Sequence, residues 1–331
     1  MPKGEPRLSA QSSKITIVGS GAIGTTIAYS LLLRRPSVEL VLFNRDENKA
    51  RVKAFDMSHC APCLAGSSVR AGSIDDTAGS DIVVVTAGVL PKADGKRSDV
   101  LRDNIEVYRK LIPRLAERSG GAVLVAITNP NDAMSYAAYR LGGLPSARVI
   151  GTGTLLDGLR LRTFIGEAYG LDPARIEAEV IGEHGDTMVP LWSRAAYSGV
   201  PLDAHLRDAG MDFGAEAKLK ILERTKRAGW DIRLAGEHSC FGISFSAVRI
   251  VESLLGGAEG PHTLSSLISG DFGVRGVYMS LPVTLGRAGV GSVSAPPLSE
   301  AEAEALRASA AAVRAQMDQA DALIDASPRA E

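Results

Sequence analysis

The sequence predicts an α/β fold built around a doubly wound parallel sheet. Short apolar runs, rich in β-branched residues, alternate with segments of helical length through the first 150 residues. These runs are continuous rather than alternating in polarity, which is typical of strands that are covered on both faces. The chain has 331 residues, more than one hydrophobic core usually supports, so we expect two substructures.

Strands and helices are expected to follow one another in a regular order. The apolar runs predict strands at residues 15–18, 38–43, 81–86, 123–128 and 148–150, and the segments between them predict helices at residues 22–33, 48–57 and 100–117. Parallel neighbours in a sheet need a crossover connection, which is usually a helix. The order of the elements therefore predicts a parallel sheet with helices on both faces.

A long alanine-rich helix is expected near the carboxyl end of the chain. Ser299 and Glu302 have the spacing of a capping box, which marks the start of a helix. One stripe of this helix is apolar and contains Leu306, Ala310, Val313 and Met317. We expect this stripe to pack against the rest of the protein.

Composition argues against several classes of protein. The net charge of −1 disfavours nucleic-acid binding, which needs a basic face. Residues 1–13 are polar and contain two prolines, so we expect a flexible tail rather than a signal peptide or a membrane anchor. No apolar run approaches the length that spans a membrane, and we expect a soluble cytoplasmic protein.

The cysteines are too few for a disulfide scaffold and fit a reducing compartment. Cys60 and Cys63 have C-x-x-C spacing, but no second pair or group of histidines accompanies them. A zinc site and a redox pair stay open as alternatives, and two ordinary thiols are favoured. We expect no metal in this protein.

A glycine-rich turn lies between the first expected strand and the first expected helix. In the motif G-x-G-x-x-G, Gly19 allows the tight turn, Gly21 lets a pyrophosphate approach the backbone, and Gly24 lets the helix pack closely on the strand. The helix N-terminus then faces the anion. This context predicts a dinucleotide site that comprises Gly19, Ser20, Gly21, Ala22, Ile23 and Gly24.

The end of the second expected strand bears on the choice of cofactor. An acidic residue here would normally bind the adenosine ribose hydroxyls, but this chain has Asn44 followed by Arg45. A neutral amide removes the charge that repels a 2′-phosphate, and a guanidinium can pair with one. The sequence therefore favours NADP(H) over NAD(H), with use of both as the alternative.

The stretch Gly182–Asp186, Gly-Glu-His-Gly-Asp, places His184 in a glycine-containing turn after the apolar pair Val180–Ile181. The unperturbed pKa of histidine lies near neutrality, so an imidazole at a strand end is suited to exchange a proton with a small ligand. A purely structural histidine is the alternative.

From about Lys14 to the final helix, the chain resembles the L-lactate/L-malate dehydrogenase family. The motifs come in the family order and at the family spacings; they are Thr86-Ala87-Gly88, Arg97 with Asn104, residues 127–132 (ITNPND), residues 151–160 (GTGTLLDGLR) and residues 182–190 (GEHGDTMVP). The resemblance implies a Rossmann-type dinucleotide-binding domain at residues 14–150 and a smaller α+β substrate domain at residues 151–331. It also implies reversible hydride transfer between a nicotinamide and a 2-oxo or L-2-hydroxy acid.

The resemblance implies roles for four charged residues. His184 matches the acid/base that protonates the reduced carbonyl oxygen, and Asp157 matches the carboxylate that orients this imidazole. Arg160 matches the anchor for the substrate carboxylate, and its spacing from Asp157 puts both on one face of a helix. Arg97 matches the arginine that closes over the substrate and polarises the carbonyl.

Polar residues at the expected strand ends complete the implied site. Asn129 matches a contact to both substrate and nicotinamide, at the edge where open α/β sheets bind ligands. The resemblance places the remaining cofactor contacts at Thr86, Ala87, Gly88, Asn104 and Thr128.

The substrate-binding residues depart from the family pattern. Lactate enzymes have glutamine, and malate enzymes arginine, at the position that aligns with Pro91, which offers no side-chain donor. Lys92 and Lys96 lie nearby and could hold an anionic substrate tail, and two solvated lysines are the alternative. Ser239 aligns with a small residue that lines the substrate pocket, and Glu237 and His238 beside it are atypical.

The family assembles as dimers and tetramers, so a homodimer or homotetramer is expected. Two other functions stay open. One is a nicotinamide-dependent glycosidase, which would need a metal-binding cysteine and histidine near the cofactor, and the other is a dinucleotide-binding protein without catalytic activity.

Overall fold

The computed structural model describes residues 12–35, 37–60, 63–64, 66–89, 97–257 and 260–326, and it describes residues 97–99 by their backbone only. Most of the expected tail at residues 1–13 lies outside these ranges, and Ser13 already belongs to the first strand. Among the described residues, no helix is both long enough and apolar enough to span a membrane.

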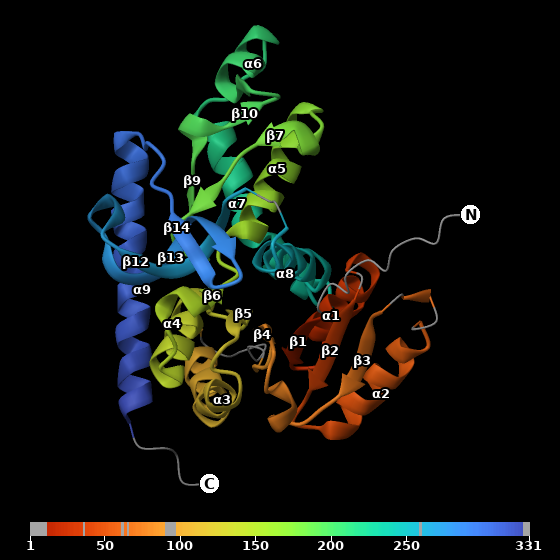
Figure 1. Ribbon diagram of the computed structural model, residues 1–331. Helices are drawn as coiled ribbons and strands as arrows, with labels where there is room; N and C mark the ends of the chain where they lie inside the picture. Colours follow the sequence, from red (N-terminus) through yellow and green to blue (C-terminus); the bar gives the residue numbers. More distant parts are fainter. Residues whose placement is uncertain are drawn as a thin grey trace, which may run out of the picture.

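In the described residues, six parallel strands form the first half of the central sheet; the sequence predicted a parallel sheet and five of these strands. They lie in the order β3-β2-β1-β4-β5-β6. Their bounds are Ser13–Val18 for β1, Val38–Phe43 for β2, Ser68–Ala71 for β3, Ile82–Val85 for β4, Val123–Ala126 for β5 and Val149–Gly151 for β6. The helices that connect them are α1 (Ala22–Arg34), α2 (Glu47–Ser58), α3 (Arg97–Arg118) and α4 (Asn131–Gly142). Figure 1 shows α1 and α2 near β1 to β3, and α3 and α4 near β5.

Helices cover both faces of the sheet, which explains why the strand sequences are continuously apolar. Val83 and Val85 of β4 pack in one core layer with residues of α3, α4 and the C-terminal helix α9 (Glu300–Asp325). Ile82 and Val84 of the same strand pack in a second layer with α1, α2 and α8 (Phe241–Leu254). Since successive side chains point to opposite faces, both sets must be apolar.

The sheet continues beyond the parallel strands, which the sequence did not predict. The antiparallel strands β12 (His262–Ser269), β13 (Arg275–Gly286) and β14 (Gly289–Val293) extend it to nine strands in the described part of the chain. The junction is the pairing of Ser265 in β12 with Gly151 in β6. A glycine suits this point, because a Cβ on Gly151 would lie 2.2 Å from the Ser135 hydroxyl.

In the first half of the chain, two expected strands end earlier than predicted, and one strand and one α-helix were missed. The expected strand at 81–86 ends at Val85 and that at 123–128 ends at Ala126, because the residues that follow turn toward the ligand-binding edge. The strand β3 was missed because it is a short edge strand with exposed Ser68 and Arg70. Helix α4 was missed because most of its residues are buried, so no periodic polarity marks it.

The remaining elements form a third core, and Figure 1 shows most of them at the top of the molecule. They are α5 (Leu155–Tyr169), β7 (Ile176–Glu177), β8 (Val180–Ile181), β9 (Val189–Pro190), β10 (Ala196–Tyr197), β11 (Val200–Pro201), α6 (Leu202–Asp208) and α7 (Ala215–Leu234). Residues of α5, α6 and α7 pack in this core with those of β7 and β8.

The C-terminal helix α9 forms as the sequence predicts. Ser299 and Glu302 make the reciprocal hydrogen bonds of a capping box, and Leu306, Ala310, Val313 and Met317 are all buried. In Figure 1 the helix runs along one side of the molecule past α4 and α3. It contacts β9 and β13 as well, so it touches elements of both halves of the chain.

Candidate active site

The glycine-rich turn after β1 has the shape of a phosphate cradle. Gly19 has a φ of 107°, and a Cβ there would lie 2.5 Å from the Thr86 hydroxyl. A Cβ on Gly24 would lie 1.9 Å from the Gly19 carbonyl oxygen, so both positions require glycine. Around Gly21, by contrast, no described atom lies within 4 Å of the Cβ position. The open side of the turn therefore faces the N-terminus of α1, which begins with Ala22 and Ile23.

The position directly after β2, where the dinucleotide motif usually has an acidic residue, holds the neutral Asn44. The Asn44 amide donates a hydrogen bond of 2.8 Å to the Ser20 hydroxyl and accepts one of 2.9 Å from the Asp46 N–H. Asp46 itself caps α2 by accepting from the Lys49 N–H. Arg45 is exposed, and its side chain has no hydrogen bond or ion pair with any described residue. It is therefore available for an anionic ligand.

The carboxyl ends of β1, β4 and β5 are joined by side-chain hydrogen bonds. Thr86 donates to the Gly19 carbonyl oxygen at 2.9 Å, and Thr128 donates to the Ala87 carbonyl oxygen at 2.8 Å. Asn104 of α3 accepts from the Val89 N–H at 2.7 Å and donates to the Asn129 carbonyl oxygen at 2.8 Å. A Cβ on Gly88 would lie 2.6 Å from the Thr128 methyl group. The predicted cofactor residues thus form one connected edge.

His184 and Asp157 form a hydrogen-bonded pair. The distance from His184 Nδ1 to Asp157 Oδ2 is 2.6 Å, and the Asp157 side chain is 1 % exposed while that of His184 is 23 % exposed. An ionised carboxylate only accepts hydrogen bonds, so Nδ1 carries the proton and Nε2 is left to exchange one with a ligand. The predicted pairing of these two residues is present in the structure.

The surroundings favour the charged forms of both residues. Burial by itself lowers the pKa of His184, but the charge of Asp157 and the hydrogen bond to it outweigh burial and raise this pKa. Burial likewise raises the pKa of Asp157, but His184 and Arg160 outweigh it, so the pKa of Asp157 is lowered. An imidazole with a raised pKa is suited to deliver a proton near neutral pH.

Arg160 lies on the same face of α5 as Asp157, as its spacing predicts. Its Nη1 donates to Asp157 Oδ1 at 3.2 Å, and its Nη2 lies 3.4 Å from the Ser239 hydroxyl. A Cβ on Gly229 of α7 would lie 3.3 Å from the guanidinium, so a glycine keeps this position open. A guanidinium has five N–H donors, so further donors remain for a substrate carboxylate.

The side chains of two predicted site residues, Lys92 and Arg97, are not among those that the structure describes. Lys92 lies outside the described residues, together with Pro91 and Lys96. Arg97 is the first residue of α3, and its side chain is not described. Among the described side chains, hydrogen bonds connect the predicted residues His184, Asp157, Arg160 and Ser239 into one group. The predicted cofactor residues at the ends of β4 and β5 form a second group.

Sequence reasoning missed a second carboxylate beside the histidine. Asp132 of α4 is 2 % exposed, and its Oδ2 accepts a hydrogen bond of 2.7 Å from the backbone N–H of His184. Its other oxygen has no hydrogen-bond partner among the described residues. Burial raises the pKa of Asp132 to about 6, although Ser265 and His184 oppose the shift. The ITNPND motif contains this residue, but sequence spacing gave no sign that it reaches the His184 turn.

We expect Asp132→Asn to raise thermal stability at pH 8. An asparagine can still accept from the His184 N–H, and it carries no buried charge. The pKa of Asp132 in the folded protein lies above the usual 3.8, so the wild-type protein loses stability as pH rises from about 4 to about 6. Above pH 6 the ionised Asp132 lowers the free energy of unfolding by about 3 kcal/mol. The stabilisation measured by thermal unfolding should therefore be largest at pH 8 and disappear near pH 4. A variant that is less stable than the wild type at pH 8 would contradict this reading of Asp132.

Cys60 and Cys63 are free thiols after α2, and no group of three or more possible metal ligands occurs in the part of the chain that the structure describes.

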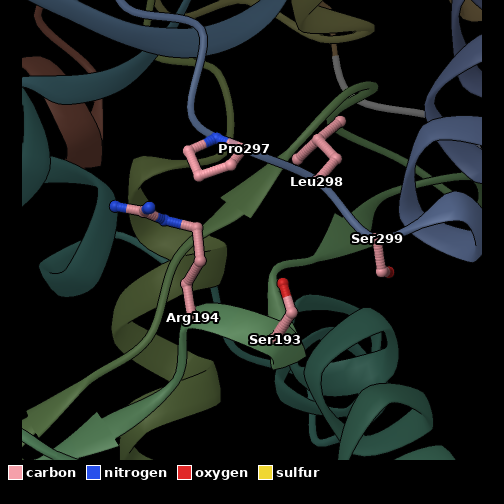
Figure 2. Close-up of a pocket in the computed structure, with 5 residues that line it drawn as sticks. All are labelled: Ser193, Arg194, Pro297, Leu298 and Ser299. Atoms are coloured by element: carbon pink, nitrogen blue, oxygen red, sulfur yellow. The ribbon is translucent and has the colours of Figure 1, made fainter.

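A surface cavity of about 510 Å³ lies between the short helix Trp192–Arg194 and the start of α9. Figure 2 shows its lining by Ser193, Arg194 and residues 297–299, none of which belongs to the predicted site.

Two models of one protein family together match nearly the whole chain. The family model described as lactate/malate dehydrogenase, NAD binding domain, matches residues 13–151. The model described as lactate/malate dehydrogenase, alpha/beta C-terminal domain, matches residues 154–324. An L-lactate dehydrogenase of Clostridium botulinum is 31 % identical over 312 residues, which cover 94 % of this chain and 98 % of that protein.

Solved structures share the fold over nearly the whole chain. The minor L-lactate dehydrogenase of Enterococcus mundtii matches with a TM-score of 0.86 at 27 % identity, covering 93 % of this chain and 98 % of that one. The malate dehydrogenase of Cryptosporidium parvum matches with a TM-score of 0.89 at 26 % identity, covering 94 % and 100 %. The predicted Rossmann-type sheet with its second α/β unit is therefore confirmed.

Proposed function

The chain belongs to the lactate/malate dehydrogenase family, and we propose that it interconverts a 2-oxo acid and the L-2-hydroxy acid with His184 as the acid/base. As a member of this family, it is an oxidoreductase that acts on a 2-hydroxy acid with a nicotinamide cofactor. The observation that carries the proposed roles is the buried Asp157 carboxylate, which accepts from His184 with one oxygen and from Arg160 with the other.

The residues of the glycine turn fit a nicotinamide dinucleotide. The turn is open at Gly21 and closed behind Gly19 and Gly24, so the backbone can approach a diphosphate at the start of α1. The edge formed by Thr86, Asn104 and Asn129 continues from this cradle. When bound there, the nicotinamide supplies or accepts the hydride.

The chain's own residues perform the remaining steps. Arg160 binds the substrate carboxylate and so orients the carbonyl carbon. His184 donates the proton on Nε2 to the carbonyl oxygen as negative charge develops there, and Asp157 stabilises the imidazolium before this transfer. In oxidation the same imidazole accepts the hydroxyl proton. Arg97 is assigned to the loop that closes over the substrate and excludes water, as the family resemblance implies.

The cofactor is proposed to be NADP(H) in preference to NAD(H). Asn44 is neutral and engaged with Ser20, Asp46 is engaged as a helix cap, and Arg45 is exposed without a partner among the described residues. A 2′-phosphate at the end of β2 would thus meet a neutral amide and a guanidinium. The two hydroxyls of an NAD ribose would lack the usual acidic partner.

The double substitution Asn44→Asp with Arg45→Ala is expected to reverse this preference. The new carboxylate repels a 2′-phosphate and accepts from ribose hydroxyls, so the NADPH/NADH ratio of kcat/KM should fall by about 10- to 100-fold, as one or two lost charged contacts imply. Steady-state kinetics with both cofactors measures the ratio. An unchanged ratio would remove the basis for the NADP(H) preference.

The substrate is proposed to carry an anionic tail. Pro91 aligns with the position whose side chain distinguishes lactate from malate enzymes, and Lys92 and Lys96, which follow it within five residues in the sequence, supply positive charge. Ser239 adds a hydroxyl beside Arg160. Carboxylate, phosphonate and sulfonate tails all suit this set of donors.

A panel of 2-oxo acids tests the function and the tail preference together. It contains pyruvate with its methyl tail, oxaloacetate, and the phosphonate and sulfonate analogues of oxaloacetate, each with NADPH and with NADH. Reduction of at least one member by the purified enzyme is expected, with the highest kcat/KM for an anionic tail. A lack of turnover with every member would overturn the proposed reaction.

Assembly as a homodimer or homotetramer is also proposed. The molar mass in solution, measured by light scattering, tests it.

A further inference from the structure

The turn that carries His184 is tied to the C-terminal helix α9. Glu183 is 6 % exposed, and its backbone N–H donates to the Ser309 hydroxyl at 2.8 Å. Its side chain accepts from Gln316 of α9 at 2.5 Å with one oxygen. The other oxygen accepts from the N–H of Thr187 at 3.0 Å and from the Thr187 hydroxyl at 2.5 Å. Both oxygens of this carboxylate are thus used within the protein.

The two glycines that flank His184 allow this packing. Gly182 has a φ of 88°, and a Cβ there would lie 2.7 Å from the Ser309 hydroxyl of α9. A Cβ on Gly185 would lie 2.7 Å from the Glu183 carboxyl group, which lies beneath the turn. The glycines therefore let the backbone approach α9 and the Glu183 side chain more closely than any other residue could. The motif Gly-Glu-His-Gly reflects attachment of the turn as well as its tight bend.

Helix α9 is held along its length and so provides a fixed support. Near its start, Glu302 accepts from the N–H and the hydroxyl of Ser193 at 2.9 and 2.6 Å. Figure 2 shows Ser193 opposite the Ser299 cap of α9 at this junction. Near its end, Arg109 of α3 donates to the carbonyl oxygens of Leu323 and Ile324 at 2.6 and 2.9 Å. Motion of the helix relative to the sheet is therefore restrained at both ends.

We propose that Glu183 and Gln316 are a positioning pair, in which Gln316 acts through Glu183 to hold His184 in register with Asp157 and Arg160. Both carboxylate oxygens of Glu183 are bonded within the protein, so the pair acts on the turn, and contact with the substrate is left to the imidazole. This inference rests on the proposed role of His184 as the acid/base. A hydrogen bond to a carboxylate is about twice as strong as one between neutral groups, so loss of the Gln316 donor frees the turn measurably.

The test compares Gln316→Leu with Gln319→Leu. Gln316 is half-buried against Glu183, whereas Gln319 lies on the same helix, is exposed, and has no side-chain hydrogen bond to a described residue. We expect Gln316→Leu to lower kcat by about 10- to 100-fold, since small displacements of a catalytic group have effects of this size, and to leave the cofactor Kd within twofold. Gln319→Leu should leave both unchanged. The swap Glu183→Gln with Gln316→Glu restores a charged hydrogen bond and should recover most of kcat.

A second measurement does not depend on turnover. His184 is observed by NMR in protein labelled with ¹³C-histidine, and its signal is assigned as the one lost in His184→Asn. Asp157 raises the pKa of His184, so a loosened turn should lower this pKa in Gln316→Leu but not in Gln319→Leu. If His184 titrates identically in both variants, the positioning pair is refuted. An enzyme that reduces no 2-oxo acid would instead refute the proposed function, while the NMR titration still decides the role of the pair.

Discussion

Replacement of His184 by alanine is expected to lower kcat for 2-oxo acid reduction by about 10²- to 10⁴-fold, the usual contribution of a positioned general acid. The variant lacks the imidazole whose Nδ1 is held by Asp157 at 2.6 Å and whose Nε2 is free to donate. Without this donor, the developing alkoxide must take its proton from water. The cofactor cradle is formed by other residues after β1, β2 and β4, so affinity for the dinucleotide should stay nearly unchanged.

Steady-state kinetics and calorimetric cofactor titration measure the two quantities separately. His205→Ala is a suitable control, because His205 lies on α6 against the Tyr197 ring and belongs to neither site. The control should retain wild-type kcat. A His184→Ala variant that loses cofactor binding in parallel with turnover would show that the residue supports the fold rather than the chemistry.

Asp157→Asn is expected to have the second largest effect, with kcat lowered by up to the same 10²- to 10⁴-fold range. The amide cannot supply the negative charge that stabilises the imidazolium, and it can present an N–H to Nδ1, which favours the wrong tautomer. Arg160 loses its charged partner as well, so the KM for the 2-oxo acid should rise.

The pH dependence of this variant gives a sharper test. Reduction needs His184 protonated, so kcat/KM falls as pH rises through the pKa of His184, which Asp157 raises in the wild type. Without the Asp157 charge, burial lowers this pKa with only Asp132 opposing it, and the alkaline limb of the profile should move to lower pH. Asp208→Asn, which removes an exposed carboxylate on α6, should leave the profile unchanged. A limb that stays in place in Asp157→Asn would contradict the assigned partnership.

Local patterns in the sequence determined the parallel sheet, the phosphate turn and the capped final helix. The turn at Gly19–Gly24 was readable because its requirements fall within six neighbouring residues. The five runs that became β1, β2, β4, β5 and β6 were readable because each must be apolar on both faces. Asp157 and Arg160 were placed on one face because helical geometry relates residues three apart.

Contacts between distant segments were decided only by the tertiary structure. The sheet extends through Ser265 and Gly151, and the His184 turn is held by Asp132 and by Gln316 of α9. Glu183 and Gln316 are 133 residues apart, and no periodicity or spacing relates such positions. The sequence by itself thus determined which chemical groups are present and which local elements carry them. Folding decided how accurately those groups are held, because that depends on buried hydrogen bonds between segments that meet only in the packed molecule.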